Sequence, residues 1–306
     1  MMRAEVPKFA GLRIDRCLIR SGWRSAFTLI ELLTVIAIIS VIAAILLPVL
    51  SSVRRQAHIM LGMNNQRQIV NAANLFALDN DDHYPESVAT VGDQDYWNWQ
   101  EPMMLTGYRA RSPRLHRSMS AYLYNYISDA DIMFCPNAPQ KYIYLQESWD
   151  AQDDWDNPET PSVQDPVSGT YCFYWNYTGF LESRNYLFHG PRTTQGGRRQ
   201  SSLLVSDYFA YNHWRSRNAY SSCEQFASSF ITEGTMLSSD YWTYDYPDAK
   251  SIPEINLHAG YTDGHVEQYS STETIVMKVI LITQTSEPYS EEIEPGRFYL
   301  PRNALR

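Results

Sequence analysis

Cysteine is scarce in this chain, and no two cysteines are spaced as Cys-x-x-Cys. The 306 residues include four cysteines. The missing spacing argues against a zinc site or a redox motif of the usual kind. The sequence also lacks a Gly-rich phosphate loop, a Gly-x-Ser-x-Gly elbow and a His-Glu-x-x-His helix. These absences predict a protein that is not an enzyme.

One hydrolase-like set remains, because such sets are recognised by geometry and not by spacing. His213, His258 and His265 would have to combine with Asp207 and a serine. We expect these residues to be structural.

Basic residues are outnumbered by acidic ones. Lys and Arg total 25 against 34 Asp and Glu, which gives a net charge of −9. Nucleic-acid binding needs clustered Lys and Arg, so no nucleic acid is expected as a partner. Arg192, Arg198 and Arg199 form one small basic loop.

Long apolar runs are absent except for one, residues 27–50. These 24 residues contain one acid, Glu31, and one proline, Pro48. As a helix they would rise about 36 Å, enough to cross a hydrocarbon core of about 30 Å. A secretory signal would have a shorter apolar region, followed by a small-residue cleavage site. Six basic residues precede the run, so we expect a cytoplasmic N-terminus and an exported remainder.

The start of this run, Ala26-Phe27-Thr28-Leu29-Ile30-Glu31, resembles the type III signal of type IV pilins and type II secretion pseudopilins. The resemblance implies that a prepilin peptidase cuts between Ala26 and Phe27 and methylates the new Phe27 amine. Glu31 and Pro48 would then be assembly residues at mature positions five and twenty-two. Removing residues 1–26 takes away six basic and two acidic residues, so the net charge changes from −9 to −13.

A carboxylate inside the membrane costs free energy unless another group neutralises its charge. A cationic N-terminal amine on a neighbouring subunit would neutralise Glu31 and fix the axial stagger of a fibre. The alternative is an uncleaved single-pass anchor, in which Glu31 reaches the cytoplasmic interface.

The apolar pattern predicts one long helix that continues into water as far as about Asn80. Its apolar positions keep helical spacing past Pro48, where we expect a kink. The predicted organisation is a leader (1–26), a transmembrane half-helix (27–50), a soluble half-helix (51–80) and an exported globular head (81–306). The fold class is α+β and pilin-like, with the long N-terminal helix packed on an antiparallel β-sheet head.

Several later segments resemble a large bacterial family of prepilin-processed proteins whose C-terminal signature is called H-X9-DG. Its landmarks are matched by Phe134-Cys135-Pro136-Asn137, by the aromatic segment 171–177 and by a histidine followed by Asp263-Gly264-His265. Four residues separate His258 from Asp263, whereas the signature has nine. From the residues alone, Thr262 to His265 predicts a type I′ hairpin turn, since Asp-Gly readily takes positive φ angles.

The sequence leaves open the pairing of a disulfide and the presence of a calcium site. One disulfide is expected in an oxidising compartment among Cys135, Cys172 and Cys223, and the sequence does not choose the pairing. Calcium is the one cofactor considered, because pseudopilins are known for calcium in the head. Its candidate ligands are the acidic clusters at 79–82, 153–156 and 240–248, with none preferred.

Aromatic residues are abundant, with 22 tyrosines and eight tryptophans. The rings either fill an antiparallel core or lie exposed and stack on sugars.

The resulting hypothesis is a structural subunit of a type II secretion pseudopilus or a type IV pilus-like fibre. It would sit in the bacterial inner membrane with its head in the periplasm or in an extracellular fibre. Its partners would be prepilin peptidase, other pilin or pseudopilin subunits and an inner-membrane assembly platform. The alternative is a membrane-anchored binding protein whose aromatic head captures polysaccharide or a secretion substrate.

Overall fold

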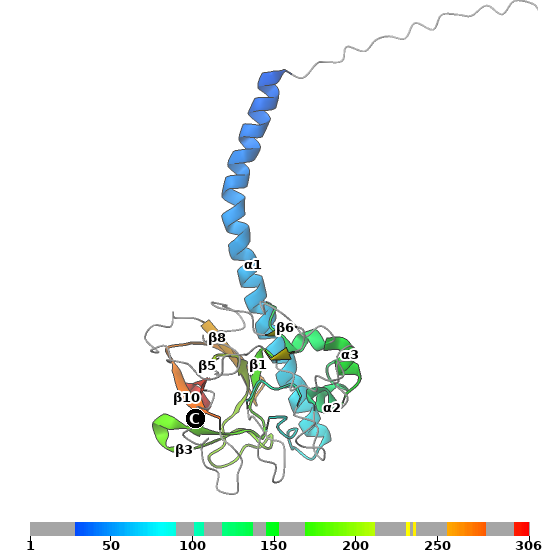
Figure 1. Ribbon diagram of the computed structural model, residues 1–306, viewed down its shortest axis with the longest axis vertical. Helices are drawn as coiled ribbons and strands as arrows, with labels where there is room; N and C mark the ends of the chain where they lie inside the picture. Colours follow the sequence, from blue (N-terminus) through cyan, green and yellow to red (C-terminus); the bar gives the residue numbers. More distant parts are fainter. Residues whose placement is uncertain are drawn as a thin grey trace, which may run out of the picture. The chain divides into compact units, whose positions relative to one another are not determined.

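A computed structural model describes residues 28–89, 101–106, 118–136, 145–152, 169–211, 231–232, 235–236, 256–279 and 297–305. The chain divides into two compact units, Met1–Val53 and Arg54–Arg306, which are described separately below. One helix, α1 (Leu29–Asp79), contributes residues to both units. Its first part is drawn in dark blue and its last part in cyan (Figure 1).

The part of α1 in the first unit is apolar on every side. Its large aliphatic side chains are exposed, for example Ile30 at 67 % and Leu47 at 68 %. A helix that is hydrophobic all round is stable only in an apolar environment. Among the described residues, α1 is the helix long and apolar enough to cross a membrane.

The polar groups of this segment are satisfied within the helix. The hydroxyls of Thr34, Ser40 and Ser51 each donate to a backbone carbonyl three or four residues earlier. The helix runs through Pro48 without interruption, and the Pro48 carbonyl accepts the bond from Ser51 at 2.8 Å. Such internal pairing is what a lipid-exposed helix requires.

In the second unit, α1 has one buried face. Its buried positions recur every three or four residues, as expected for a helix that packs on one side. They are Gly62, Gln66, Ile69, Val70, Ala72, Ala73 and Ala77. Most of these side chains are small, so the helix backbone lies close to the sheet.

The sheet beneath this helix has four strands. They are β1 (Tyr171–Phe173), β4 (Leu203–Asp207), β8 (Asn256–Tyr261) and β9 (Val266–Ser270). Their order is β1-β4-β8-β9, and each neighbouring pair is antiparallel. A Cβ on Gly260 of β8 would lie 2.6 Å from Cγ2 of Val70. The glycine therefore permits the close approach of α1 to β8.

A second antiparallel sheet has five strands. Their order is β3 (Tyr186–His189), β2 (Thr178–Leu181), β10 (Thr274–Lys278), β11 (Arg297–Pro301) and β5 (Ala210–Tyr211). Two short strands, β6 (Ile231–Thr232) and β7 (Thr235–Met236), form a separate hairpin. The 3-10 helix η3 (Glu182–Arg184) joins β2 to β3, and η5 (Arg302–Leu305) follows β11.

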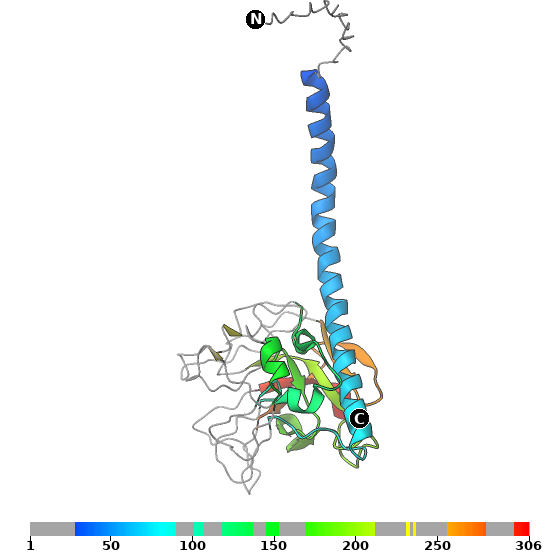
Figure 2. The same cartoon turned by 90° about the vertical axis from the view of Figure 1, so that its right-hand side faces the viewer.

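Three short helical segments lie on one side of the second unit, drawn in green in Figures 1 and 2. They are α2 (Met119–Leu123), the 3-10 helix η2 (Ala130–Met133) and α3 (Leu145–Asp150). The ring of Phe76 on α1 makes edge-to-face contacts with Tyr122 and Tyr126. The Tyr126 hydroxyl donates to Asp79 Oδ2 at 2.6 Å, which fixes the end of α1 against this layer.

The predicted α+β class is confirmed: a long apolar N-terminal helix precedes antiparallel sheets. The aromatic segment 171–177 supplies core residues and no exposed platform, since Tyr171, Tyr174, Trp175 and Tyr177 are all buried. The aromatic clusters at 96–99 and 241–246 lie outside the described residues, as do residues 212–214 of the cluster at 208–214, in which Tyr208 and Phe209 are buried.

The turn between β8 and β9 differs from the prediction. Gly264 has a φ of +90°, but Asp263 is not among the positive-φ residues, as a type I′ turn would require. The Gly264 N–H donates to the Tyr261 carbonyl at 2.9 Å, and the Tyr261 N–H donates to the His265 carbonyl at 3.0 Å. This is a three-residue hairpin in which glycine takes the left-handed position, so the type I′ prediction is wrong.

Candidate functional site

The first candidate site is the start of α1. The Glu31 carboxylate accepts hydrogen bonds from both the backbone N–H and the hydroxyl of Thr28, each at 2.8 Å. In return the Glu31 N–H donates to the Thr28 hydroxyl at 3.3 Å. This reciprocal pair is a capping box, which satisfies two of the unpaired N–H groups at a helix start. Ala26 and Phe27 lie outside the described residues.

Glu31 is the lone acid between Thr28 and Val53. It lies in the first turn of the helix, where the helix dipole places partial positive charge. The carboxylate therefore has a local partner in the single chain, and it remains exposed to the surroundings.

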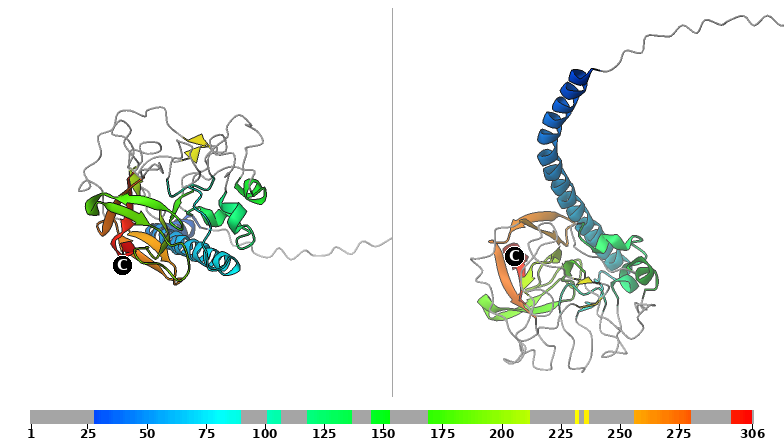
Figure 3. Two further views of the ribbon diagram at one scale, coloured as in Figure 1. Left: turned by 90° about the horizontal axis from the view of Figure 1, so that it is seen from below. Right: turned by 45° about the horizontal axis from the view of Figure 1, so that its top comes forward.

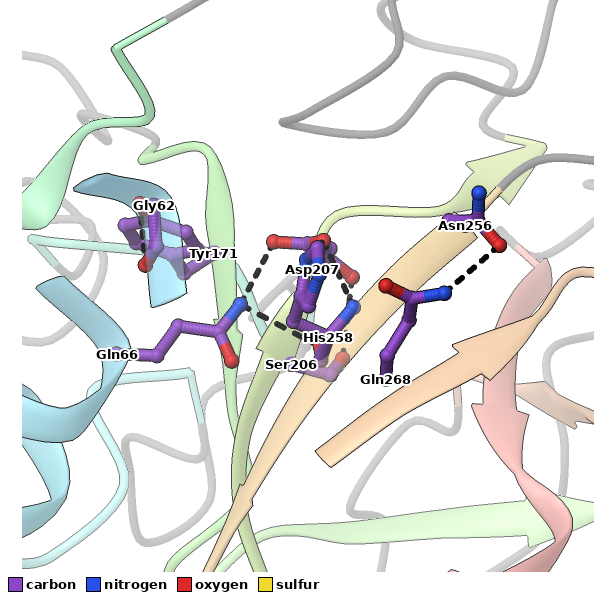
Figure 4. A network of polar contacts seen from close by, with 8 residues as sticks. All are labelled: Gly62, Gln66, Tyr171, Ser206, Asp207, Asn256, His258 and Gln268. Carbon is purple, nitrogen blue, oxygen red and sulfur yellow. Dashed lines mark hydrogen bonds and ion pairs between the residues drawn. The ribbon is translucent and has the colours of Figure 1, made fainter. Parts of the chain in front are cut away.

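The second candidate site is a buried polar network that joins α1 to the four-stranded sheet (Figure 4). Asp207, at the end of β4, accepts two hydrogen bonds from His258 of β8, at 2.9 Å from the backbone N and 3.1 Å from Nδ1. Its other oxygen accepts a hydrogen bond of 2.6 Å from Nε2 of Gln66 on α1. The same Nε2 lies 3.4 Å from the His258 carbonyl oxygen.

The three side chains of this network are inaccessible to solvent. Gln66 and His258 are 0 % exposed, and Asp207 is 1 % exposed. A buried carboxylate is costly unless donors surround it, and here three donors from two elements do so. The network therefore ties a specific register of α1 to β4 and β8.

The same geometry bears on catalysis. Asp207 and His258 do form the pair that a hydrolase would need, but the histidine is fully buried. The adjacent Ser206 hydroxyl lies 3.1 Å from the Tyr174 hydroxyl and donates to the Asp207 carbonyl. The His258 ring is therefore closed to solvent. His213 lies outside the described residues.

The third candidate site is the β8–β9 hairpin tip. Asp263 Oδ1 accepts hydrogen bonds from the backbone and from Nδ1 of His265, whose ring stacks on Tyr261 at 4.5 Å between centroids. Partial burial alone would raise the pKa of Asp263, but the hydrogen bonds from His265 outweigh it, and the pKa lies below the ordinary value. Asn74 of α1 donates to the Thr262 carbonyl at 3.2 Å, so the tip is also attached to the helix.

His258 and the Asp263-Gly264 turn are therefore parts of one hairpin with different roles. His258 lies within β8 opposite Gln268 and points to Asp207, whereas Asp263 and His265 are exposed at the tip. The sequence did not predict the role of Gln66. The only signal was a glutamine at a position that continues the buried face of the helix.

Metal ligands are not gathered in the described part of the chain. No group of three His, Cys, Asp or Glu side chains there is placed to hold an ion. Of the three acidic clusters considered for calcium, only 79–82 is described, and 153–156 and 240–248 lie outside the described residues.

Two of the cysteines are described. Cys135 and Cys172 are buried and are not joined to each other, and Cys223 lies outside the described residues. Burial raises the pKa of the Cys172 thiol, and a hydrogen bond with Tyr174 lowers it by a smaller amount. The pKa therefore lies well above the ordinary value.

An apolar N-terminal helix with a capped glutamate at its start, followed by antiparallel sheets, is an α+β arrangement consistent with a pilin-like fold. In agreement, residues 24–47 match the prokaryotic N-terminal methylation motif. That motif implies processing by prepilin peptidase and assembly with other pilins, and the proteins that carry it are structural rather than catalytic. No curated protein and no solved structure matches the chain significantly.

Proposed function

We propose that this chain is a structural subunit, pseudopilin-like or minor-pilin-like, of a type II secretion pseudopilus or a type IV pilus-like fibre. Prepilin peptidase cuts after Ala26 and methylates Phe27. The helix then leaves the inner membrane through an assembly platform, with the head in the periplasm or in the extracellular fibre.

The observation that carries this proposal is the apolar surface of α1 within the first unit. Its side chains are apolar on all sides, and its one carboxylate stands at the capped start. In the membrane, lipid covers this surface, and in a fibre the equivalent helices of other subunits cover it. The Glu31 carboxylate would then exchange part of its contact with Thr28 for the N-terminal amine of a neighbour.

The buried network of the second unit supports the same role. A fibre subunit transmits force between its helix and its head, so the two must not slide past each other. Gln66, Asp207 and His258 fix the helix by directional bonds, in addition to the apolar contacts of Ile69 and Val70. Directional bonds specify register, whereas apolar contacts alone are less selective.

The test is mass spectrometry combined with fibre recovery. Membrane-extracted protein should begin at N-methylated Phe27, and sheared fibres should contain it. Glu31→Ala should abolish fibres while leaving processed protein in the membrane, and Glu31→Gln should separate loss of charge from loss of side-chain length. Protein that keeps residues 1–26 in cells with an active prepilin peptidase would refute the proposal.

A further inference from the structure

The loop after β3, residues 192–200, concentrates positive charge on an acidic molecule. It contains Arg192, Arg198 and Arg199 and no acid, whereas the whole chain has a net charge of −9. All three arginines are exposed, and no ion pair engages them in the described part of the chain. We call residues 192–200 the arginine loop.

The arginine loop is held in one shape by its own hydrogen bonds. The Gly196 N–H donates to the Thr193 carbonyl at 3.1 Å, and the Gln200 N–H donates to the Gly197 carbonyl at 3.0 Å. Gly196 and Arg199 both have positive φ angles, of 67° and 71°. Arginine rarely adopts a positive φ angle. The conformation of Arg199 is therefore imposed by the hydrogen bonds of the loop and not by a local preference of the residue.

The loop is also anchored to the chain that follows α1. Thr194 donates to Asp82 twice, at 2.9 Å from the backbone N–H to the carbonyl and at 3.0 Å from the hydroxyl to Oδ1. The Tyr84 N–H donates to the Arg192 carbonyl at 3.0 Å. A loop that is ordered before binding loses less conformational entropy when it binds. The arginine loop is therefore suited to recognition by shape as well as by charge.

The same unit carries a matching negative surface on other elements. Asp129, the N-cap of η2, is exposed, as are Glu147 and Asp150 of α3, and the described stretches 118–136 and 145–152 contain no Lys or Arg. Gln146 fixes this surface, because its Oε1 accepts from the Ala130 N–H at 3.0 Å and its Nε2 donates to Asp150 Oδ1 at 2.9 Å. We call these three carboxylates the acidic surface.

The two surfaces are built from different elements of the second unit, the arginine loop after β3 and the acidic surface at η2 and α3. Strand β3 and helix α3 lie on opposite sides of the second unit (Figures 1 and 3), whereas the arginine loop that follows β3 is bonded to Asp82 and Tyr84. A contact between unlike surfaces of identical subunits is heterologous, and it propagates as an open filament when the rotation between subunits does not close. Guanidinium and carboxylate groups also pair with defined geometry, which fixes the register between partners.

We propose that the arginine loop of one copy of this chain docks on the acidic surface of a second copy, as a heterologous contact between the globular heads of successive subunits. This inference rests on the proposed function, because it names the contact that the heads make within the fibre. The helices supply the hydrophobic association, and the charged heads select the rotation and rise.

The experiment uses charge reversal in the full processed chain. Arg198→Glu with Arg199→Glu, and separately Glu147→Arg with Asp150→Arg, should each reduce fibre recovery about tenfold. Co-expression of the two reversed chains should restore recovery to within about threefold of wild type, because each supplies the charge that the other lacks. A chain with all four reversals should also assemble.

The controls separate this contact from folding and from the proposed function. Unchanged thermal melting of the detergent-extracted variants should show that the exposed substitutions leave the fold intact. Fibres that are lost in Glu31→Ala but unaffected by either charge reversal would overturn the docking contact alone. Loss in the reversed chains without rescue by mixing would also overturn it, and would assign the arginines to an anionic partner of another kind. Wild-type chains that form no Glu31-dependent fibres would refute the proposed function instead.

Discussion

Thr28 and Glu31 hold each other at the start of α1, since the Glu31 carboxylate accepts from the Thr28 N–H and hydroxyl, both at 2.8 Å. The contact gives the single chain a way to satisfy a carboxylate at the edge of an apolar helix before any neighbour arrives. In the proposed fibre, the same contact would position that carboxylate for a neighbour's amine. Thr28 is therefore a positioning residue for Glu31.

The first prediction tests this positioning. Thr28→Val keeps the shape of the side chain but removes the hydroxyl that bonds Glu31, so fibre recovery should fall by roughly fivefold. Thr28→Ser keeps the hydroxyl and should assemble like wild type. The measurement is the amount of processed subunit in sheared fibres relative to the membrane. Equal recovery from the Val and Ser variants would show that the hydroxyl has no role in assembly.

The second prediction concerns the approach of α1 to the sheet. Gly260→Ala would place a Cβ 2.6 Å from Val70 Cγ2 and 3.0 Å from Val205 Cγ1. We expect this overpacking to lower the free energy of unfolding by about 1–3 kcal/mol. Urea denaturation of the processed chain in detergent, followed by tryptophan fluorescence, measures it.

A double variant provides the control for that prediction. Val70→Ala removes the methyl groups that the new Cβ would strike, so Gly260→Ala with Val70→Ala should be more stable than the sum of the two single effects predicts. Simple additivity would show that α1 does not press on Gly260 in solution.

The third prediction concerns the buried network. Asp207→Ala leaves the donors of Gln66 and His258 buried without their acceptor and should cost about 3–5 kcal/mol of unfolding free energy. Gln66→Leu removes one donor of a buried carboxylate and should cost about 1–3 kcal/mol. Gln68→Leu, two positions along on a half-exposed site, is the matched control and should change stability little. Equal effects of the two Gln substitutions would contradict the role given to Gln66.

The fold was largely readable from the sequence, and the buried network was not. The uninterrupted apolar run and the helical spacing beyond Pro48 predicted a single helix, because that periodicity depends only on local chain geometry. The role of Gln66 could not be predicted, because its partner Asp207 is 141 positions away and only tertiary packing brings the two together. The hairpin was predicted at the right place with the wrong turn type, because Asp-Gly sequences also suit turns in which glycine alone is left-handed.

The fourth prediction concerns pH. Partial burial raises the pKa of Asp263, but the hydrogen bonds and charge of His265 together outweigh it, so the pKa is lowered and the folded chain binds this proton less tightly than the unfolded chain. Stability from this pair is therefore present above about pH 4 and is lost as the pH falls below it. The urea midpoints of wild type and Asp263→Asn should differ at pH 6 and converge near pH 3. Because the Asp263 side chain is 67 % exposed, we expect the difference to be small. A gap that stays constant over this range would contradict the pairing.

The fifth prediction concerns Cys172 on β1. Its side chain is 1 % exposed, and burial raises the pKa of the thiol, so the reactive thiolate is scarce in the folded chain. At pH 8, N-ethylmaleimide should leave Cys172 unmodified in the native protein and should modify it in urea, as peptide mass spectrometry would show. Because β1 is an edge strand of the four-stranded sheet and pairs only with β4 among the described strands, its opening would expose this thiol first. Rapid labelling of the native protein would therefore mean that β1 detaches readily from β4. The labelling rate would then report how stable the pairing of β1 with β4 is.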